Sequence, residues 1–114
     1  MDSTFYHNPQ CSKSRQALAL LHEKGLKPRL VEYLKTPLTE AELRALLKKL
    51  HMSAHQVIRS NEAIYKDLAL NSESSEDVLI AAMVNHPKLI ERPIFVNGQK
   101  AVIGRPPEKV LELI

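Results

Sequence analysis

The first 33 residues contain a strand–helix–strand pattern, which restricts the possible folds of this chain more than any other feature. The short apolar segment Ser3–Tyr6 favours a strand, and residues 29–33 alternate well enough to predict a second strand. Between them, Gln16–Lys24 has helical spacing of its apolar residues and is followed by Gly25, a typical residue after a helix C-terminus. This βαβ unit implies two parallel strands joined by a right-handed crossover.

Residues 39–86 have a different pattern, which predicts a compact insertion of four helical pieces. The expected helices are Leu43–Leu50, a short turn that ends near Ile58, Glu62–Leu68 and Val78–Asn85. Each follows a polar residue whose side chain can accept a hydrogen bond from the first turn. These expected capping residues are Thr39 (with Glu42), Ser53 (with Gln56), Asn61 and Ser74 (with Asp77).

The last section predicts a hairpin and a closing helix. Two apolar runs, Ile94–Val96 and Lys100–Ile103, flank Asn97-Gly98, a pair that favours a type I′ turn. Pro106–Ile114 is expected to close the fold as a helix with Val110, Leu111 and Ile114 inward. The predicted class is therefore α/β, a thioredoxin-like mixed four-stranded sheet. Its helical insertion separates an N-terminal βαβ unit from a C-terminal ββα unit, all within one domain of residues 1–114.

Composition excludes several functions. The chain has a net charge of +3, its basic residues form no long run, and only 4% of its residues are aromatic, so we predict no nucleic-acid binding. No segment approaches the ~18 apolar residues of a membrane span, and residues 1–4 do not resemble a secretory signal. Because a single cysteine cannot form an internal disulfide, we expect a cytoplasmic, reducing location.

That cysteine, Cys11, lies in the polar segment His7–Arg15 between the first strand and the first helix. A strand that stops at an Asn-Pro pair and turns into a helix places Cys11 at or beside the helix N-terminus. There, unpaired backbone N–H groups and the helix dipole favour an anion, which is the thiolate, a bound oxyanion or both in turn. A free thiol has a pKa of about 8.5, and such surroundings, with Lys13 and Arg15 nearby, lower this pKa. We therefore predict a reactive thiol.

Three of the six arginines lie between predicted helices and strands: Arg59 after a helical turn, Arg92 before Pro93, and Arg105 between a glycine and a proline. A guanidinium group presents five donors in a planar fork, which suits a tetrahedral oxyanion. Each arginine alone is best interpreted as a solvated surface residue. Together with Cys11, the three predict one anion site, provided that the fold brings their loops together.

Two further observations limit the chemistry. His7 is expected either to approach Cys11 as a protonated imidazole that stabilises the thiolate or to be a polar loop residue without a catalytic role. Cys11–Ser14 has the pattern C-x-x-S, so an internal dithiol cycle is excluded and an external thiol must resolve an oxidised Cys11. Ala17 stands where a phosphatase-type C-x-x-x-x-x-R loop carries arginine, which argues against a phosphate-monoester hydrolase of that type. No histidine has ligand-like spacing with cysteine, so we predict no metal site.

The sequence resembles the glutaredoxin-dependent arsenate reductases, the ArsC family of the thioredoxin-like superfamily, and looks like one of its short members. The matching segments cover nearly the whole chain and are Tyr6–Pro9 with Cys11, Ser14-Arg15, Tyr33–Pro37, Arg59 with Asn61, His86-Pro87, Leu89–Ile94 and Arg105–Leu111. The resemblance implies that Cys11 is the nucleophile and that His7 tunes it. The implied oxyanion ligands are Arg59, Arg92 and Arg105, and the implied supporting residues are Ser14, Arg15 and Pro93, the last as a cis proline.

The resemblance also implies a reaction and its partners. The Cys11 thiolate attacks arsenic(V) and water leaves, glutathione attacks the thiol-arsenate adduct, glutaredoxin reduces the mixed species, and arsenite is released. Arsenate or a similar oxyanion is then the substrate and glutathione the co-substrate. No bound cofactor is implied, and the chain is expected to be a monomer that contacts neither nucleic acid nor membrane.

Two other classes remain open. Spx-type transcriptional regulators share this fold and bind RNA polymerase without turnover, but they usually carry a C-x-x-C switch and lack His-Asn-Pro. A monothiol-glutaredoxin-like protein would share the C-x-x-S pattern and glutathione. The arginines at positions 59, 92 and 105 and the helical insertion count against that reading.

Overall fold

The computed structural model describes residues 3–114 as two compact units. Residues up to 36 and residues 92–114 form one unit, and residues 37–91 form the other. The first unit contains β1 (Ser3–Tyr6), α1 (Ser12–Glu23), β2 (Arg29–Val31), β3 (Ile94–Asn97), β4 (Lys100–Ile103) and the 3₁₀ helix η2 (Pro107–Leu113). We call it the sheet unit and residues 37–91 the helical unit.

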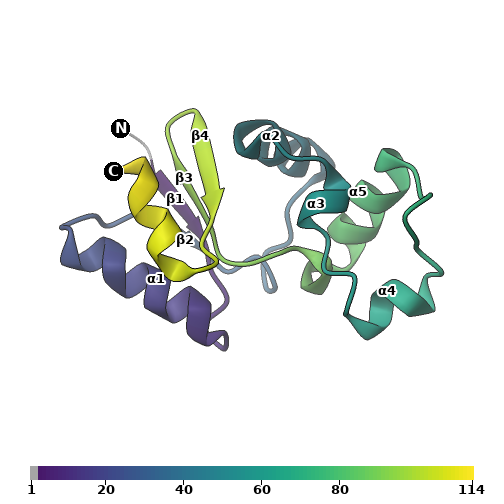
Figure 1. The fold of residues 1–114 in the computed structure, drawn as a ribbon, viewed down its shortest axis with the longest axis horizontal. Helices are drawn as coiled ribbons and strands as arrows, with labels where there is room; N and C mark the ends of the chain where they lie inside the picture. The colour runs from purple at the N-terminus through teal and green to yellow at the C-terminus, as the bar shows by residue number, and fades with distance from the viewer. Residues whose placement is uncertain (1–2) are drawn as a thin grey trace. The chain divides into compact units, whose positions relative to one another are not determined.

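The sheet unit is built on four strands in the order β2-β1-β3-β4. β1 and β2 are parallel, whereas β3 runs antiparallel to both β1 and β4. Phe5 of β1 lies opposite Phe95 of β3, and α1 and η2 lie together on that side of the sheet (Figure 1). Ala17, Leu21 and Val110 complete a core from which water is excluded. The predicted mixed thioredoxin-like sheet is confirmed.

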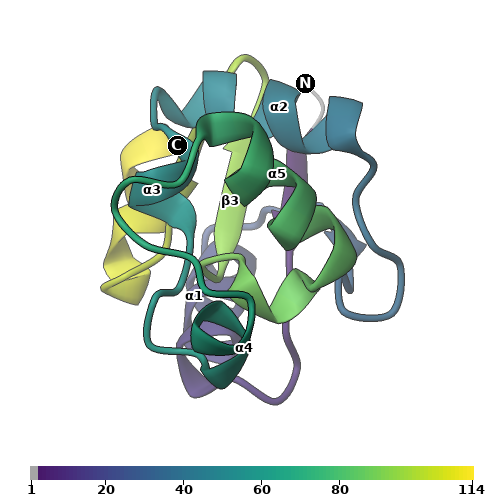
Figure 2. The ribbon, with the colours of Figure 1, turned by 90° about the vertical axis from the view of Figure 1, so that its right-hand side faces the viewer.

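The helical unit contains the four predicted helices and a short 3₁₀ segment. Their bounds are α2 (Glu40–Leu50), α3 (Ala54–Val57), α4 (Ala63–Asp67), α5 (Glu76–Asn85) and η1 (Pro87–Leu89). α5 packs against α2, α3 and η1, and Figure 2 shows α3 beside it. The predicted capping boxes of Thr39 with Glu42 and of Ser53 with Gln56 are both present. No helix in residues 3–114 has the length and apolar character needed to cross a bilayer.

Several predicted boundaries are wrong. α1 begins at Ser12 and not at Gln16, because Cys11 itself is the N-cap residue. Glu62 and not Asn61 precedes α4. Ser75 and not Ser74 caps α5: the Ser75 hydroxyl accepts from the N–H of Val78, whereas the Ser74 hydroxyl accepts from Asn71 in the preceding turn.

The closing segment also differs from its prediction. It is a 3₁₀ helix, in which Val110 is buried, Leu111 is half-buried and Ile114 at its end is 56% exposed. Ile114 is therefore not an inward-facing residue.

The hairpin between β3 and β4 is present, but its turn is not the predicted one. Asn97 pairs with Lys100 as the last residue of β3, so the loop consists of Gly98 and Gln99. Of these two, Gly98 alone has a positive φ, which fits a type II′ turn with glycine first and not type I′. The Asn97 amide donates instead to the carbonyl of Leu113 at 2.7 Å and ties the hairpin to η2.

Candidate functional site

Each of the four strands has one terminus at the same end of the sheet. The pairs Tyr6–Val31, Tyr6–Ile94 and Ile94–Ile103 place the ends of β1, β2 and β4 beside the start of β3. The loop that follows β1, the residues that precede β3 and the residues that follow β4 therefore meet there. These segments carry Cys11, Arg92 and Arg105, so the fold of the sheet unit brings together residues that lie up to 94 positions apart.

The loop that carries Cys11 is held by its own backbone and by one arginine. The Cys11 N–H donates to the carbonyl of Asn8 at 3.0 Å, and the Asn8 side chain accepts from the N–H of Gln10. Arg15 reaches back from α1 and donates to the carbonyl of Pro9 at 2.8 Å. Cys11 has extended backbone angles, as an N-cap residue requires. These contacts hold the sulfur at the start of α1, as the sequence predicts.

Two of the three predicted arginines face the sulfur. The Arg105 guanidinium lies 3.8 Å from Cys11 Sγ, and its Nε donates to the carbonyl of Arg92 at 2.7 Å. Arg92 also donates to the thiol. Guanidinium groups are positively charged, so the sulfur lies in a positive environment.

The pKa of the Cys11 thiol is lower than that of an ordinary cysteine. Burial raises it, but the backbone N–H of Ser14, the hydrogen bond from Arg92, the N–H of Lys13 and the charge of Arg92 together lower it by more. The helix N-terminus and the guanidinium thus act in the same direction. The structure supports the predicted activated thiolate.

This lowered pKa predicts the pH dependence of alkylation at Cys11. Because the thiolate is the nucleophile, the rate with iodoacetamide should rise with pH and reach half of its maximum below the value of about 8.5 of a free thiol. The rate is measured from pH 5 to 10, with free glutathione alkylated in parallel as the control. A midpoint equal to that of glutathione would contradict the activation argued from Ser14 and Arg92.

Two prolines and a glycine lie next to the arginines in the chain. The Arg92–Pro93 bond is cis, as the family resemblance implies, and the Arg105–Pro106 bond is also cis. The Gly104 N–H donates to the carbonyl of Pro93 at 2.8 Å. A methyl group on Gly104 would lie 2.9 Å from the ring of Pro93 and 3.1 Å from Val110, so Gly104 allows this close contact.

Replacing Gly104 with alanine should therefore destabilise the protein by about 1–3 kcal/mol, as overpacked buried sites do. It should also slow Cys11 alkylation, because any shift of Pro93 or Gly104 moves Arg105 as well. Urea unfolding and the alkylation rate are measured in both variants. Gly25→Ala is the control: nothing lies within 4 Å of the new methyl group, although its positive φ costs stability. Alkylation slowed equally in both variants would contradict this role of Gly104.

His7 makes a contact other than the predicted one. Its Nδ1 shares a 2.6 Å hydrogen bond with the Ser14 hydroxyl, and that hydroxyl also accepts from the backbone N–H of Asn8. Burial lowers the pKa of His7, Glu32 opposes this change, and Arg15 adds to it. A neutral imidazole is therefore favoured, and a role of His7 in tuning the thiol stays a prediction. The Ser14 hydroxyl, which is completely buried, thus links His7 to the backbone of Asn8 in the Cys11 loop.

Arg59 belongs to the helical unit, where two carboxylates surround it. Its guanidinium lies 2.8 Å from Glu91 and 3.5 Å from Glu62, and its side chain is mostly buried. The Arg59 N–H donates to the carbonyl of Leu89, beside the bridge between Ile58 and Ile90. Its predicted role as an oxyanion ligand stays a prediction.

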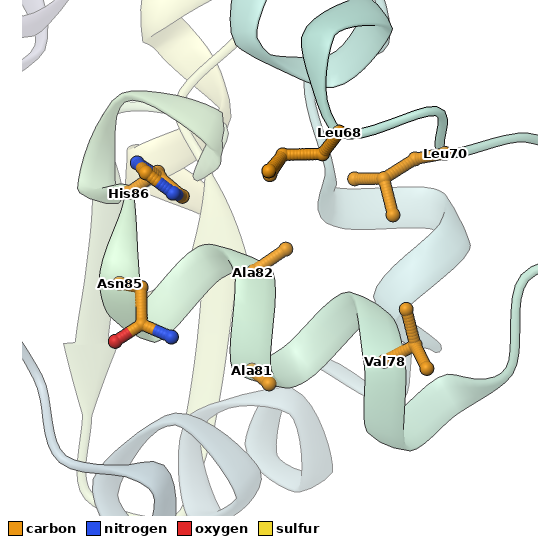
Figure 3. A pocket seen from close by; sticks show the side chains of 7 residues that line it. All are labelled: Leu68, Leu70, Val78, Ala81, Ala82, Asn85 and His86. Atoms are coloured by element: carbon orange, nitrogen blue, oxygen red, sulfur yellow. The ribbon is translucent and has the colours of Figure 1, made fainter.

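An apolar pocket of about 230 Å³ in the helical unit lies between α5 and the residues after α4, with Leu68, Leu70, Val78 and Ala82 in its wall (Figure 3). A second pocket, of about 210 Å³, borders the Cys11 loop. In residues 3–114, no three His, Cys, Asp or Glu side chains cluster as a metal site. Asn8, whose carbonyl and amide shape the loop, was not singled out from the sequence, although the His-Asn-Pro motif contains it.

Comparisons with known proteins show which family this chain resembles over nearly its whole length. The sequence pattern of the ArsC family matches residues 6–113. The uncharacterized protein YfgD of Escherichia coli K12 is 57% identical over 111 residues, which cover 96% of this chain and 93% of that protein. An arsenate reductase of Haemophilus influenzae is 47% identical over 116 residues and the full length of both. The solved arsenate reductase of Vibrio cholerae has a TM-score of 0.96 and 47% identity, and covers 100% of this chain and 98% of its own.

Proposed function

The chain belongs to the ArsC family, and from this premise we propose that it reduces arsenate to arsenite through an adduct on Cys11. One observation carries the proposal: a thiol with a lowered pKa lies 3.8 Å from the guanidinium of Arg105 and accepts a hydrogen bond from Arg92. A nucleophilic sulfur beside two fixed positive groups suits attack on an oxyanion. Arsenate is the substrate named for several relatives.

In the first step, the Cys11 thiolate attacks the arsenic of H₂AsO₄⁻. A sulfur–arsenic bond forms, one arsenic–oxygen bond breaks, and the departing oxygen takes a proton and leaves as water. Arsenic stays in its +5 state. Arg92 and Arg105 lower the repulsion between the two anions and stabilise the charge on the remaining oxygens.

In the second step, glutathione forms a disulfide with Cys11. The sulfur–arsenic bond breaks with its electron pair on arsenic, the proton of the glutathione thiol passes to an arsenic oxygen, and arsenite leaves. Glutaredoxin then removes the glutathione from Cys11 by thiol–disulfide exchange. Overall, arsenate and two glutathione molecules yield arsenite, one glutathione disulfide and one water. The outside thiol is needed because Cys11 is the only cysteine of the chain.

The remaining predicted residues take supporting roles in this proposal. His7 and Ser14 hold the Cys11 loop, and Arg59 is kept as a predicted oxyanion ligand. Pro93 positions Arg92, and Arg15 fastens the loop at Pro9. The proposed setting is the cytoplasm, where glutathione and glutaredoxin are kept reduced, and the proposed active form is a monomer.

The proposal is tested by a coupled assay that follows NADPH oxidation with arsenate, glutathione, glutathione reductase and glutaredoxin. We expect turnover that saturates with arsenate and falls to background when glutathione or glutaredoxin is omitted. Phosphate in place of arsenate is the control for nonspecific NADPH loss, because it is a similar oxyanion that thiols do not reduce. If no turnover occurs and RNA polymerase co-purifies with the protein, this proposal is replaced by an Spx-type transcriptional regulator.

A further inference from the structure

The Cys11 loop has a second neighbour besides the arginines. It lies in the opposite direction along the strand order, toward β2. In the strand order β2-β1-β3-β4, the loop follows β1, Arg92 precedes β3 and Arg105 follows β4. The residues after β2 therefore border the loop on its other side. The pocket of about 210 Å³ lies there, lined by His7–Gln10 from the loop and by Glu32, Leu34 and Lys35. Nothing in the proposed arsenate chemistry uses this pocket.

The pocket has opposite charges at short separation. Lys35 Nζ lies 3.6 Å from a carboxylate oxygen of Glu32, and their side chains are 81% and 42% exposed. An exposed pair of this kind stabilises a protein little, so either partner is available to a ligand. Residues 32–35 form a turn that does not depend on these two side chains, because the backbone N–H of Lys35 donates to the carbonyl of Glu32.

This charge arrangement selects the kind of ligand. An oxyanion needs an excess of positive charge. Arg92 and Arg105 provide that excess beside Cys11, whereas in this pocket Glu32 cancels the charge of Lys35. A group that carries both an ammonium and a carboxylate matches Glu32 and Lys35 at once. Pro9 and Leu34 supply an apolar wall for its carbon chain. A cavity of about 150 Å³ is known to hold benzene, so one of this size has room for an amino-acid-sized group.

We propose that this pocket binds the zwitterionic γ-glutamyl end of glutathione, with Glu32 facing its ammonium and Lys35 its carboxylate. The inference rests on the proposed function, because it locates the thiol co-substrate of that reaction. Gln10 lines the pocket and directly precedes Cys11, so the cysteinyl part of the tripeptide extends toward the sulfur. Oxyanion and thiol then approach Cys11 from opposite flanks and do not compete.

The test is an NMR titration of the whole protein with S-methylglutathione, which has no free thiol and cannot react. The amide signals of Gln10, Glu32 and Lys35 should shift and saturate. Lys35→Glu should weaken binding by about tenfold or more, as expected for loss of a hydrogen bond to a charged group. Lys27→Glu is the matched control: it makes the same charge change at an exposed lysine before β2, at the opposite edge of the sheet. S-methylcysteinylglycine, which lacks the γ-glutamyl group, should bind as weakly as S-methylglutathione binds to Lys35→Glu.

Three results would overturn the inference: no shifts at the pocket, equal weakening by Lys35→Glu and Lys27→Glu, or equal binding of the two S-methyl compounds. The titration contains neither arsenate nor a reactive thiol, so its outcome is independent of turnover. Binding at the pocket without arsenate turnover would refute the proposed reaction and leave the pocket assignment standing. Turnover without binding at the pocket would refute the pocket assignment alone.

Discussion

Replacing Cys11 with serine is expected to reduce arsenate-dependent NADPH oxidation to the rate measured without the protein. A serine hydroxyl has nearly the shape of the thiol but does not ionise at neutral pH, so the attacking anion is lost. The pKa of Cys11 is lowered because N–H groups of α1 and the hydrogen bond and charge of Arg92 outweigh the burial that opposes the anion. No second cysteine is present to replace it. The coupled assay measures the effect.

The matched control for this variant is Ser12→Ala, which changes an exposed side chain at the next position and leaves the sulfur intact. It should retain the activity of the unmodified protein. Circular dichroism and the urea midpoint should show that Cys11→Ser is folded, because Cys11 is only partly buried. Arsenate-dependent turnover retained by folded Cys11→Ser would contradict an adduct on Cys11 and require another nucleophile.

Local sequence signals predicted the features that depend on neighbouring residues. The strand–helix–strand unit, the caps at Thr39 and Ser53 and the position of Cys11 at a helix N-terminus are all present. Capping involves residues two or three positions apart, so it can be read from a short segment. Of two adjacent serines, the sequence analysis chose Ser74 as the cap of α5, and this was wrong because Ser75 is the N-cap residue.

Features that depend on distant residues were missed for one physical reason: a sequence does not show what is buried or what lies opposite. Asn97-Gly98 favours a type I′ turn locally, but Asn97 stays in β3, where its amide binds the carbonyl of Leu113. The contact of His7 with the Ser14 hydroxyl, seven positions along the chain, has no local sequence signal. The ion pairs of Arg59 with Glu62 and Glu91 likewise became visible only in the folded unit.

Replacing Arg92 with alanine is expected to raise the pKa of Cys11 and to weaken arsenate binding. Arg92 lowers this pKa both by its hydrogen bond and by its charge, so the midpoint of the alkylation profile should move toward that of a free thiol. A hydrogen bond to a charged group contributes about 1.5–3 kcal/mol, so the half-saturating arsenate concentration should rise by roughly ten- to a hundredfold. Both quantities are measured on the same preparation.

Arg29→Ala is the control, because Arg29 is exposed at the start of β2, at the opposite edge of the sheet from Cys11. It removes the same charge and should change neither quantity. Arg92→Lys separates the two contributions of Arg92: it keeps the charge and should preserve part of the pKa shift, but it loses the planar fork that binds an oxyanion. Equal effects of Arg92→Ala and Arg29→Ala would mean that net charge, and not a guanidinium fixed at the sulfur, controls the site. Arsenate chemistry at Cys11 would then have no geometric basis.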